Sequence, residues 1–233
     1  MARLSNLKLR KSVIETCLAM NASGINQGTS GNVSVRGGKG FLITASGVSY
    51  EAMTPEQVVE VDLDGGYYGD WMPSSEWRMH LDIYRGRPEA EAVVHTHSTH
   101  AAALSCLRKD IPPFHYMIAV AGGATLRCAD YATFGTRELS ENMLRALEGR
   151  KACLLANHGT ICFGPSLDKA LWLAGEVEAL CQQYFLACEA GDPVILDDAE
   201  MARVLDRFAT YGKQDAVALP KAQEAGEAPV KRD

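Results

Sequence analysis

Apolar residues recur at helical spacing in the first segment of the chain. Val13, Ile14, Cys17 and Leu18 would share one face of a helix over residues 5–23, and Gly24 is a suitable stop. Residues 26–32 are small and polar, which is typical of a loop. An amphipathic helix followed by a polar loop is therefore expected here.

Alternating apolar and polar positions then predict two β-hairpins. In the first, Val33 and Val35 alternate with polar neighbours, and residues 36–40 turn the chain into a second strand over residues 41–44. A short helix around Pro55 is then followed by a strand over residues 58–63, and a turn over residues 64–66 closes the second hairpin.

The next part of the chain alternates between helical patterns and short buried strands. Ser75 and Ser166 can each cap a helix. The expected elements are a helix from Ser75 to Gly86, a strand over 92–95, helices over 98–107 and 136–147, a strand over 153–156, the longest helix after Ser166 and a last helix over 199–210. The mixture predicts a single-domain α/β fold, with a central, largely antiparallel mixed sheet covered by helices.

From Lys213 onwards the chain consists mainly of Ala, Lys, Glu and Pro, without a periodic apolar face. We therefore expect one domain over residues 1–212 and a disordered tail over residues 213–233.

Charge and composition exclude several classes of protein. The formal net charge is −6, and no Lys/Arg run provides the basic surface that nucleic-acid or membrane binding needs. No charge-free apolar run reaches the roughly 20 residues of a membrane span, and the N-terminus lacks a signal-peptide pattern. A phosphate-bearing substrate would have to be held by local donors.

The seven cysteines contain no CxxC pair, and most lie in apolar stretches. They are expected to be reduced core residues of a cytoplasmic protein. The alternative is a nucleophilic or metal-binding thiolate, but no cysteine has a nearby base in sequence.

The motif Val93-Val-His-Thr-His97 carries the sharpest chemical signal. Side chains alternate along a strand, so His95 and His97 would share one face about 6–7 Å apart at the backbone. Two imidazoles placed in this way can bind one zinc ion, and burying them without a partner would be costly. Structural pairing of the two rings is the alternative.

A third ligand and an acid/base group would complete a catalytic zinc site. His158 follows a buried strand and precedes a glycine that would allow close backbone approach. His100 is its rival as third ligand. Glu76 is the candidate carboxylate, although a helix N-terminus favours an acidic residue anyway. His80 and His115 are interpreted as ordinary histidines.

Three segments could together bind an anion: residues 28–32, 45–47 and 74–75. They offer hydroxyls, an amide and accessible backbone N–H groups. No G-x-x-x-x-G-K-[ST] motif and no G-x-G-x-x-G after a strand is present, which disfavours a nucleotide or dinucleotide site.

These segments, in this order, resemble the class II aldolase/adducin family over residues 7–212. The motifs that carry the resemblance are Asn26-Gln-Gly-Thr-Ser-Gly-Asn-Val-Ser-Val-Arg36, Pro73-Ser-Ser-Glu-Trp-Arg78, Ala92-Val-Val-His-Thr-His97, His115-Tyr-Met-Ile118, Tyr131-Ala-Thr-Phe-Gly-Thr-Arg-Glu-Leu139 and Thr210-Tyr-Gly212. One departure is Asn157, where the resembling aldolases carry His, and it puts the surroundings of His158 in question.

The resemblance implies a role for each matching residue. His95, His97 and His158 would bind Zn²⁺ or another divalent metal, with Glu76 as a further ligand and acid/base. Tyr116, reaching into a neighbouring subunit, would be the proton donor. The other implied residues are Asn32, Ser46, Gly47, Ser74 and Ser75 for phosphate binding, and Phe134 and Tyr211 for the aldehyde pocket.

The resemblance also implies an activity and an assembly. The expected reaction is zinc-dependent, reversible cleavage of a deoxy-ketose 1-phosphate of the L-fuculose 1-phosphate type to dihydroxyacetone phosphate and an aldehyde such as L-lactaldehyde, in a homotetramer with sites between subunits. The main alternative is a 5-(methylthio)ribulose-1-phosphate or 5-deoxyribulose-1-phosphate aldolase of salvage. A pentulose-5-phosphate 4-epimerase, an oxo-tetronate-phosphate decarboxylase and a non-enzymatic adducin-like head are further alternatives.

Overall fold

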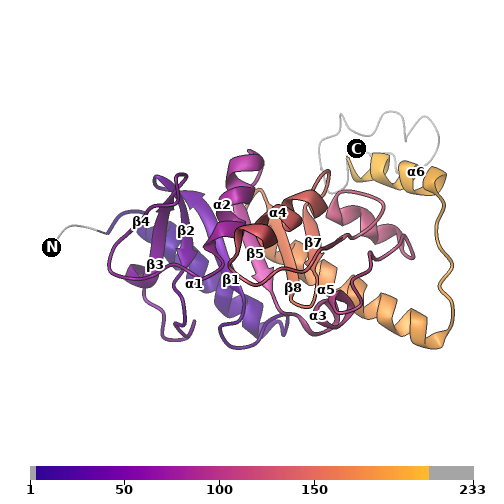
Figure 1. Ribbon diagram of the computed structural model, residues 1–233, viewed down its shortest axis with the longest axis horizontal. Coiled ribbons are helices and arrows are strands. Elements are labelled where there is room, and N and C mark those ends of the chain that lie inside the picture. Colours follow the sequence, from indigo (N-terminus) through magenta and orange to yellow (C-terminus); the bar gives the residue numbers. More distant parts are fainter. Residues whose placement is uncertain (1–3, 210–233) are drawn as a thin grey trace, which may run out of the picture.

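A computed structural model describes residues 4–209 of the chain, so Tyr211 and the expected tail over residues 213–233 lie outside it. The described residues form one eight-stranded sheet with the order β4-β3-β2-β1-β5-β8-β7-β6 (Figure 1). Every neighbouring pair is antiparallel except β6 and β7. The strands are β1 (Asn32–Gly37), β2 (Gly40–Thr44), β3 (Val58–Asp62), β4 (Tyr67–Tyr68), β5 (Ala92–Thr96), β6 (Cys128–Ala129), β7 (Ala152–Leu155) and β8 (Gly159–Gly164).

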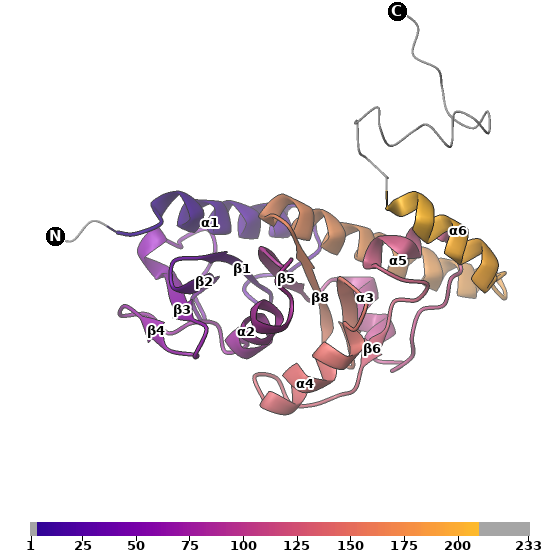
Figure 2. The same ribbon diagram turned by 90° about the horizontal axis from the view of Figure 1, so that it is seen from above.

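Helices cover both faces of the sheet (Figure 2). One layer contains α1 (Leu7–Ala22), α3 (Thr99–Ser105) and α5 (Leu167–Ala190), and the opposite layer contains α2 (Trp77–Gly86) and α4 (Arg137–Ala146). The remaining helical elements are the 3₁₀ turns η1 (Pro55–Gln57) and η2 (Tyr116–Ala121) and the helix α6 (Asp198–Phe208). This arrangement confirms the predicted α/β fold with a largely antiparallel mixed sheet.

The strand alternation divides the core into two parts. Val94 packs in the cluster that contains α1 and α5, whereas Val93 packs with α2 and α4. Because successive strand residues point to opposite faces, a sheet covered on both sides needs apolar residues at nearly every position. All five residues of β5 are buried accordingly, and His95 comes directly after the apolar run of Ala92, Val93 and Val94.

The two predicted helix caps differ in the structure. Ser166 caps α5 as expected, because its side chain accepts a hydrogen bond from the Lys169 N–H. The predicted cap at Ser75 is wrong: Glu76 occupies the N-cap position of α2 and makes no side-chain cap. The Glu76 N–H instead donates to the Ser74 hydroxyl at 3.3 Å, so the carboxylate remains available for other partners.

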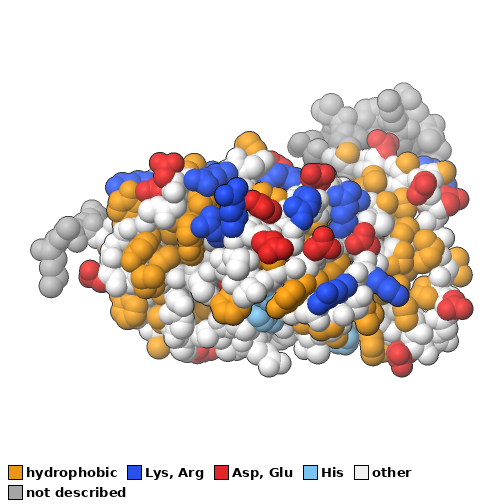
Figure 3. All heavy atoms as spheres, in the orientation of Figure 1, with side chains coloured by type: hydrophobic (Ala, Val, Ile, Leu, Met, Phe, Trp, Pro, Cys, Tyr) orange, Lys and Arg blue, Asp and Glu red, His pale blue; other side chains and the backbone are white. Residues whose placement is uncertain are grey.

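Charged side chains of both signs lie on the surface of the described residues. On the face shown in Figure 3, acidic and basic side chains are interspersed. Among residues 4–209, no helix combines the length and apolar character required to cross a bilayer.

The cysteines provide a test of this packing. Cys17, Cys153, Cys162 and Cys181 are buried and Cys106 and Cys188 are exposed, and all seven are free thiols. Burial also raises the pKa of Cys162 to about 12, which suppresses the reactive thiolate.

We expect iodoacetamide to modify Cys106 in the native protein while the four buried thiols react only after denaturation. Peptide mass spectrometry would measure this, and rapid native alkylation of Cys153 would contradict the described core.

Candidate functional site

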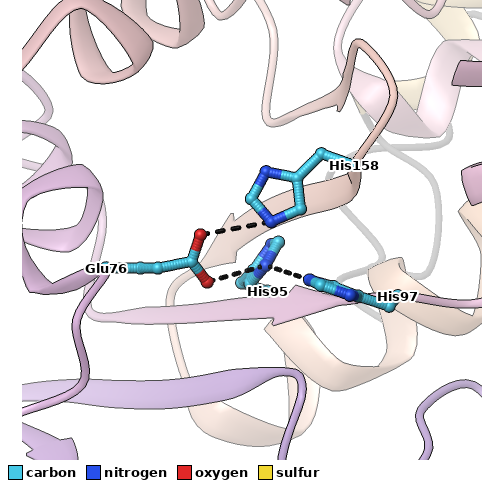
Figure 4. A group of neighbouring side chains, drawn as sticks. All are labelled: Glu76, His95, His97 and His158. Atoms are coloured by element: carbon cyan, nitrogen blue, oxygen red, sulfur yellow. Dashed lines mark hydrogen bonds and ion pairs between the residues drawn. The ribbon is translucent and has the colours of Figure 1, made fainter. Parts of the chain in front are cut away.

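Three imidazoles and one carboxylate converge at one end of the central strands (Figure 4). Nε2 of His95 lies 3.0 Å from Nε2 of His97 and 3.1 Å from Oε2 of Glu76. Nε2 of His158 lies 3.1 Å from Oε1 of Glu76. One atom from each of the four side chains lies within 4.8 Å of all the others.

The pairing of β5 with its neighbours produces this convergence. His95 pairs with Asn32 of β1 on one side and with Ile161 of β8 on the other. Residues 156–158 form the short β7–β8 connection, in which Asn157 adopts a left-handed φ of 53°. A Cβ on Gly159 would lie 2.3 Å from the Thr96 carbonyl oxygen, so only glycine allows the approach that places His158 beside β5.

A second set of backbone contacts places Glu76. The N–H of Ser74 donates to the Thr44 carbonyl at 2.9 Å, and the N–H of Ser46 donates to the Met72 carbonyl at 3.1 Å. The segment before α2 therefore runs beside the end of β2, and the carboxylate is directed toward His95 and His158.

Burial and mutual charge shift the pKa values in the cluster. Burial alone raises the pKa of Glu76, but the neighbouring imidazoles of His95 and His158 outweigh it and hold that pKa well below its usual range. Burial lowers the pKa of His95, yet the Glu76 carboxylate brings it above its usual value. Burial, followed by the charges of His95 and His158, lowers the pKa of His97 to about 4. A charged carboxylate and basic, unprotonated imidazoles are the forms that ligate metals.

The donor set fits a divalent metal ion. The Thr160 carbonyl accepts a hydrogen bond from Nδ1 of His95 at 2.9 Å, which leaves a lone pair on Nε2. Oε1 of Glu76 is buried and forms no hydrogen bond despite its closeness to His158. Three imidazole nitrogens and one carboxylate oxygen that lacks a hydrogen bond are ligands suited to a divalent metal ion.

A polar cavity of about 60 Å³ opens on one side of Glu76. It is lined by all five residues expected to bind phosphate, namely Asn32, Ser46, Gly47, Ser74 and Ser75. Sequence reasoning missed Thr44 and Tyr50, which also line it. The Thr44 hydroxyl is buried and forms no hydrogen bond with another described residue, but its place inside an apolar strand gave no sign of this.

A larger cavity of about 280 Å³ opens on the other side of the same carboxylate. Phe134 lines it, as expected, together with Tyr131 and Asn157, for which no role was predicted. Gly135 has a φ of +73°, and a Cβ there would lie 2.8 Å from the Ser75 carbonyl oxygen. This glycine therefore allows the Phe134 loop to approach the residues that start α2.

The comparisons with known proteins agree with this geometry. The family model of the class II aldolase and adducin N-terminal domain matches residues 11–185, well over half of the chain. The chain belongs to the class II aldolase/adducin family. The resemblance stated from the motifs is thus confirmed.

Related enzymes of this family cover nearly the whole chain. The L-fuculose phosphate aldolase of Escherichia coli K12 is 52% identical over 206 residues, which are 88% of this chain and 96% of the relative. The 5-methylthioribulose-1-phosphate/5-deoxyribulose-1-phosphate aldolase of Rhodospirillum rubrum is 48% identical over 218 residues, or 94% and 99% of the two chains. A solved L-fuculose 1-phosphate aldolase superposes with a TM-score of 0.85 at 38% identity, covering 90% of this chain and all of the other.

Not every predicted residue joins the class II aldolase site within one chain. Tyr116 is half exposed at the start of η2, stacks on the His115 ring and lines neither cavity. Tyr211 lies outside the described residues. His100 is not part of the cluster, because its Nδ1 contacts the Glu178 carboxylate of α5 at 2.8 Å.

The metal assignment can be tested without a substrate. Replacing His97 by Ala removes one of three imidazoles, so zinc content should fall from about one ion per chain to a small fraction of that. Elemental analysis after dialysis would measure it. His115→Ala is the matched control, since this imidazole lies outside the cluster. A His97→Ala protein that keeps its zinc would refute the assignment.

Proposed function

We propose that this chain is a zinc-dependent, reversible sugar-phosphate aldolase of the cytoplasm. Its substrate would be a deoxy-ketose 1-phosphate of the L-fuculose 1-phosphate type, cleaved to dihydroxyacetone phosphate and an aldehyde such as L-lactaldehyde. The observation that carries the proposal is the position of Glu76 and its histidines between two cavities. Glu76, Ser75 and Ser30 line both of them, so one substrate could extend across the metal-binding residues from phosphate to aldehyde.

The smaller cavity supplies the means to hold the phosphate. Asn32, Ser74 and Ser75 would contribute an amide and two hydroxyls, and Ser46 would add another hydroxyl, although its N–H already donates to the Met72 carbonyl. On the face shown in Figure 3, acidic side chains lie among the Lys and Arg residues. The binding energy of the phosphate would then come from these local donors and would orient the reacting carbons.

The chain's own residues would carry the proton transfers. A zinc ion held by His95, His97 and His158 would supply a Lewis-acid charge that stabilises the negative charge developing as the carbon–carbon bond breaks. Glu76, buried beside the bond to be broken, would transfer the proton at C3. The proton on the C4 oxygen would be exchanged with Tyr116 of a neighbouring subunit.

Two features support a site shared between subunits of a homotetramer. Tyr116 is exposed and lies away from the cavities of its own chain. The larger cavity also exposes Phe134, with 63% of its surface accessible, although an aldehyde pocket should be closed to water. A neighbouring subunit, and Tyr211 as a further wall, would complete it.

A second candidate substrate is 5-(methylthio)ribulose 1-phosphate or 5-deoxyribulose 1-phosphate. The Rhodospirillum rubrum relative named for these compounds covers more of this chain than the Escherichia coli relative does. Such an enzyme would need the same metal and phosphate residues and a different aldehyde pocket. Epimerase, decarboxylase and adducin-like functions are less favoured, and an inert adducin-like head would have no need of the buried Glu76 and histidine cluster.

The first experiment measures dihydroxyacetone phosphate released from L-fuculose 1-phosphate and, in parallel, from 5-(methylthio)ribulose 1-phosphate. We expect release that a chelator abolishes and added zinc restores, and the substrate with the higher kcat/KM would identify the pathway. Absence of release from both substrates by zinc-loaded protein would reject the aldolase proposal.

The role of Tyr116 predicts complementation between defective subunits. Tyr116→Phe should lower kcat severely while zinc content and phosphate binding persist, because only the proton at the C4 oxygen is affected. Co-expression with His97→Ala should restore about a quarter of the wild-type rate, since random assembly around a ring gives about a quarter of the sites both intact residues. Failure to recover any activity in the mixed protein would contradict a site built from two subunits.

A further inference from the structure

A chain of hydrogen bonds runs from the Glu76 carboxylate into the core behind it. Nδ2 of Asn32 lies 3.0 Å from Oε2 of Glu76, and Oδ1 of Asn32 lies 2.5 Å from Nε2 of His80. Nδ1 of His80 is 2.6 Å from the Ser34 hydroxyl, which is 2.8 Å from the Tyr84 hydroxyl. All five residues are at most 5% exposed.

The carboxylate fixes the direction of every bond in this chain. A charged carboxylate only accepts, so Asn32 must present its NH₂ group to Glu76 and its oxygen to His80. His80 must then donate from Nε2. In the neutral ring, Nδ1 consequently accepts from Ser34, whose oxygen accepts in turn from Tyr84. One tautomer of His80 satisfies all these contacts.

Burial keeps His80 in the neutral form that this arrangement requires. Burial, followed by the charge of His95, lowers the pKa of His80 to about 3. The ring is fully buried, so no water can replace a lost contact. The donor at Nε2 is therefore permanent, and it opposes rotation of the Asn32 amide.

The orientation of that amide matters because Asn32 lies between the Glu76 carboxylate and the cavity proposed to bind phosphate. One hydrogen of its NH₂ group is directed to Glu76, while the residue also lines the polar cavity with Ser46 and Ser74. A flipped amide would direct its oxygen toward the carboxylate and withdraw the donor from an anion bound in the cavity.

We propose that His80 is a positioning residue, which, as the Nε2–H tautomer, locks the Asn32 amide so that its NH₂ group serves both Glu76 and the substrate phosphate. The inference rests on the proposed function in so far as that function assigns phosphate to the cavity. His80 belongs neither to the cluster of Glu76 and the three histidines nor to the cavity lining, and its hydrogen bond toward the site is to Asn32.

Neutron diffraction from deuterated crystals of the full-length, zinc-loaded protein tests the proposed orientation directly. We expect deuterium on Nε2 of His80, none on Nδ1, and the ND₂ group of Asn32 facing Glu76. Deuterium on Nδ1, or an Asn32 oxygen facing Glu76, would overturn the proposal whatever reaction the enzyme catalyses.

Matched variants test the consequence. His80→Phe keeps a planar ring but removes the donor, and we expect kcat/KM to fall roughly 10- to 100-fold, as is typical when a group that orients a ligand is lost. His80→Gln retains an amide N–H about as far along the side chain as Nε2, and it should recover most of that loss. Equal losses in the two variants would show a merely structural role.

Tyr84→Phe is the control for damage to the core. It removes a buried hydroxyl at the far end of the same chain, while Ser34 can still donate to His80. We expect a lower Tm with kcat/KM of the folded protein within about threefold of wild type, because the Asn32 contact is untouched. A loss as large as that of His80→Phe would contradict positioning through Asn32.

Calorimetric binding of inorganic phosphate separates this inference from the proposed function. In protein that retains Asn32, His80→Phe should weaken phosphate binding. In protein that already carries Asn32→Ala, the same substitution should change the phosphate Kd less than about threefold, since residues acting through one another are not additive. An equally large effect of His80→Phe in both proteins would overturn the proposal. Wild-type protein that binds phosphate but releases no dihydroxyacetone phosphate would reject the aldolase function instead. If His80→Phe does not fold, the His80→Gln variant and the neutron structure decide the question.

Discussion

The pairing of β5 between β1 and β8 is the constraint on which the site depends. It sets Asn32 opposite His95 on one side and Thr160 opposite Thr96 on the other. A shift by one residue would turn the imidazole of His95 to the other face of the sheet. The same ladder bonds therefore determine the core packing of Val93 and Val94 and the position of His95 in the cluster.

The fold also meets the cost of placing polar groups at this depth. Buried imidazoles and a buried carboxylate are unfavourable unless each polar atom has a partner. Glu76 has two imidazoles and the Asn32 amide, and His95 has the Thr160 carbonyl. One oxygen of Glu76 still lacks a hydrogen bond. The cluster is thus nearly, but not fully, satisfied by protein groups, which is expected where a cation belongs to the native state.

Sequence reasoning found what local periodicity can reveal. The i, i+2 spacing of His95 and His97 and the glycine after His158 led directly to the cluster. The strands β6 and β8 were missed because their assignment depends on pairing with distant segments: β6 has only two residues, and β8 directly follows a three-residue turn. His80 was interpreted as ordinary for a similar reason. Its partners Asn32 and Ser34 are 48 and 46 residues away in sequence, and no helical pattern within α2 indicates that contact.

The two cavities differ in how their walls are built, and this difference bears on specificity. His95 and Asn32 lie on paired strands and His97 and His158 directly beside strand ends, whereas Phe134 and Tyr131 lie on a longer connecting segment. Asn157 accepts a hydrogen bond from Arg108 at 2.7 Å, and that guanidinium lies over the Tyr131 ring, so these side chains are coupled to one another rather than to the sheet. Loops tolerate substitution more readily than strands that carry a core. A family built in this way can retain one cleavage chemistry and change the aldehyde it accepts, which agrees with relatives of nearly equal identity that are named for different sugar phosphates.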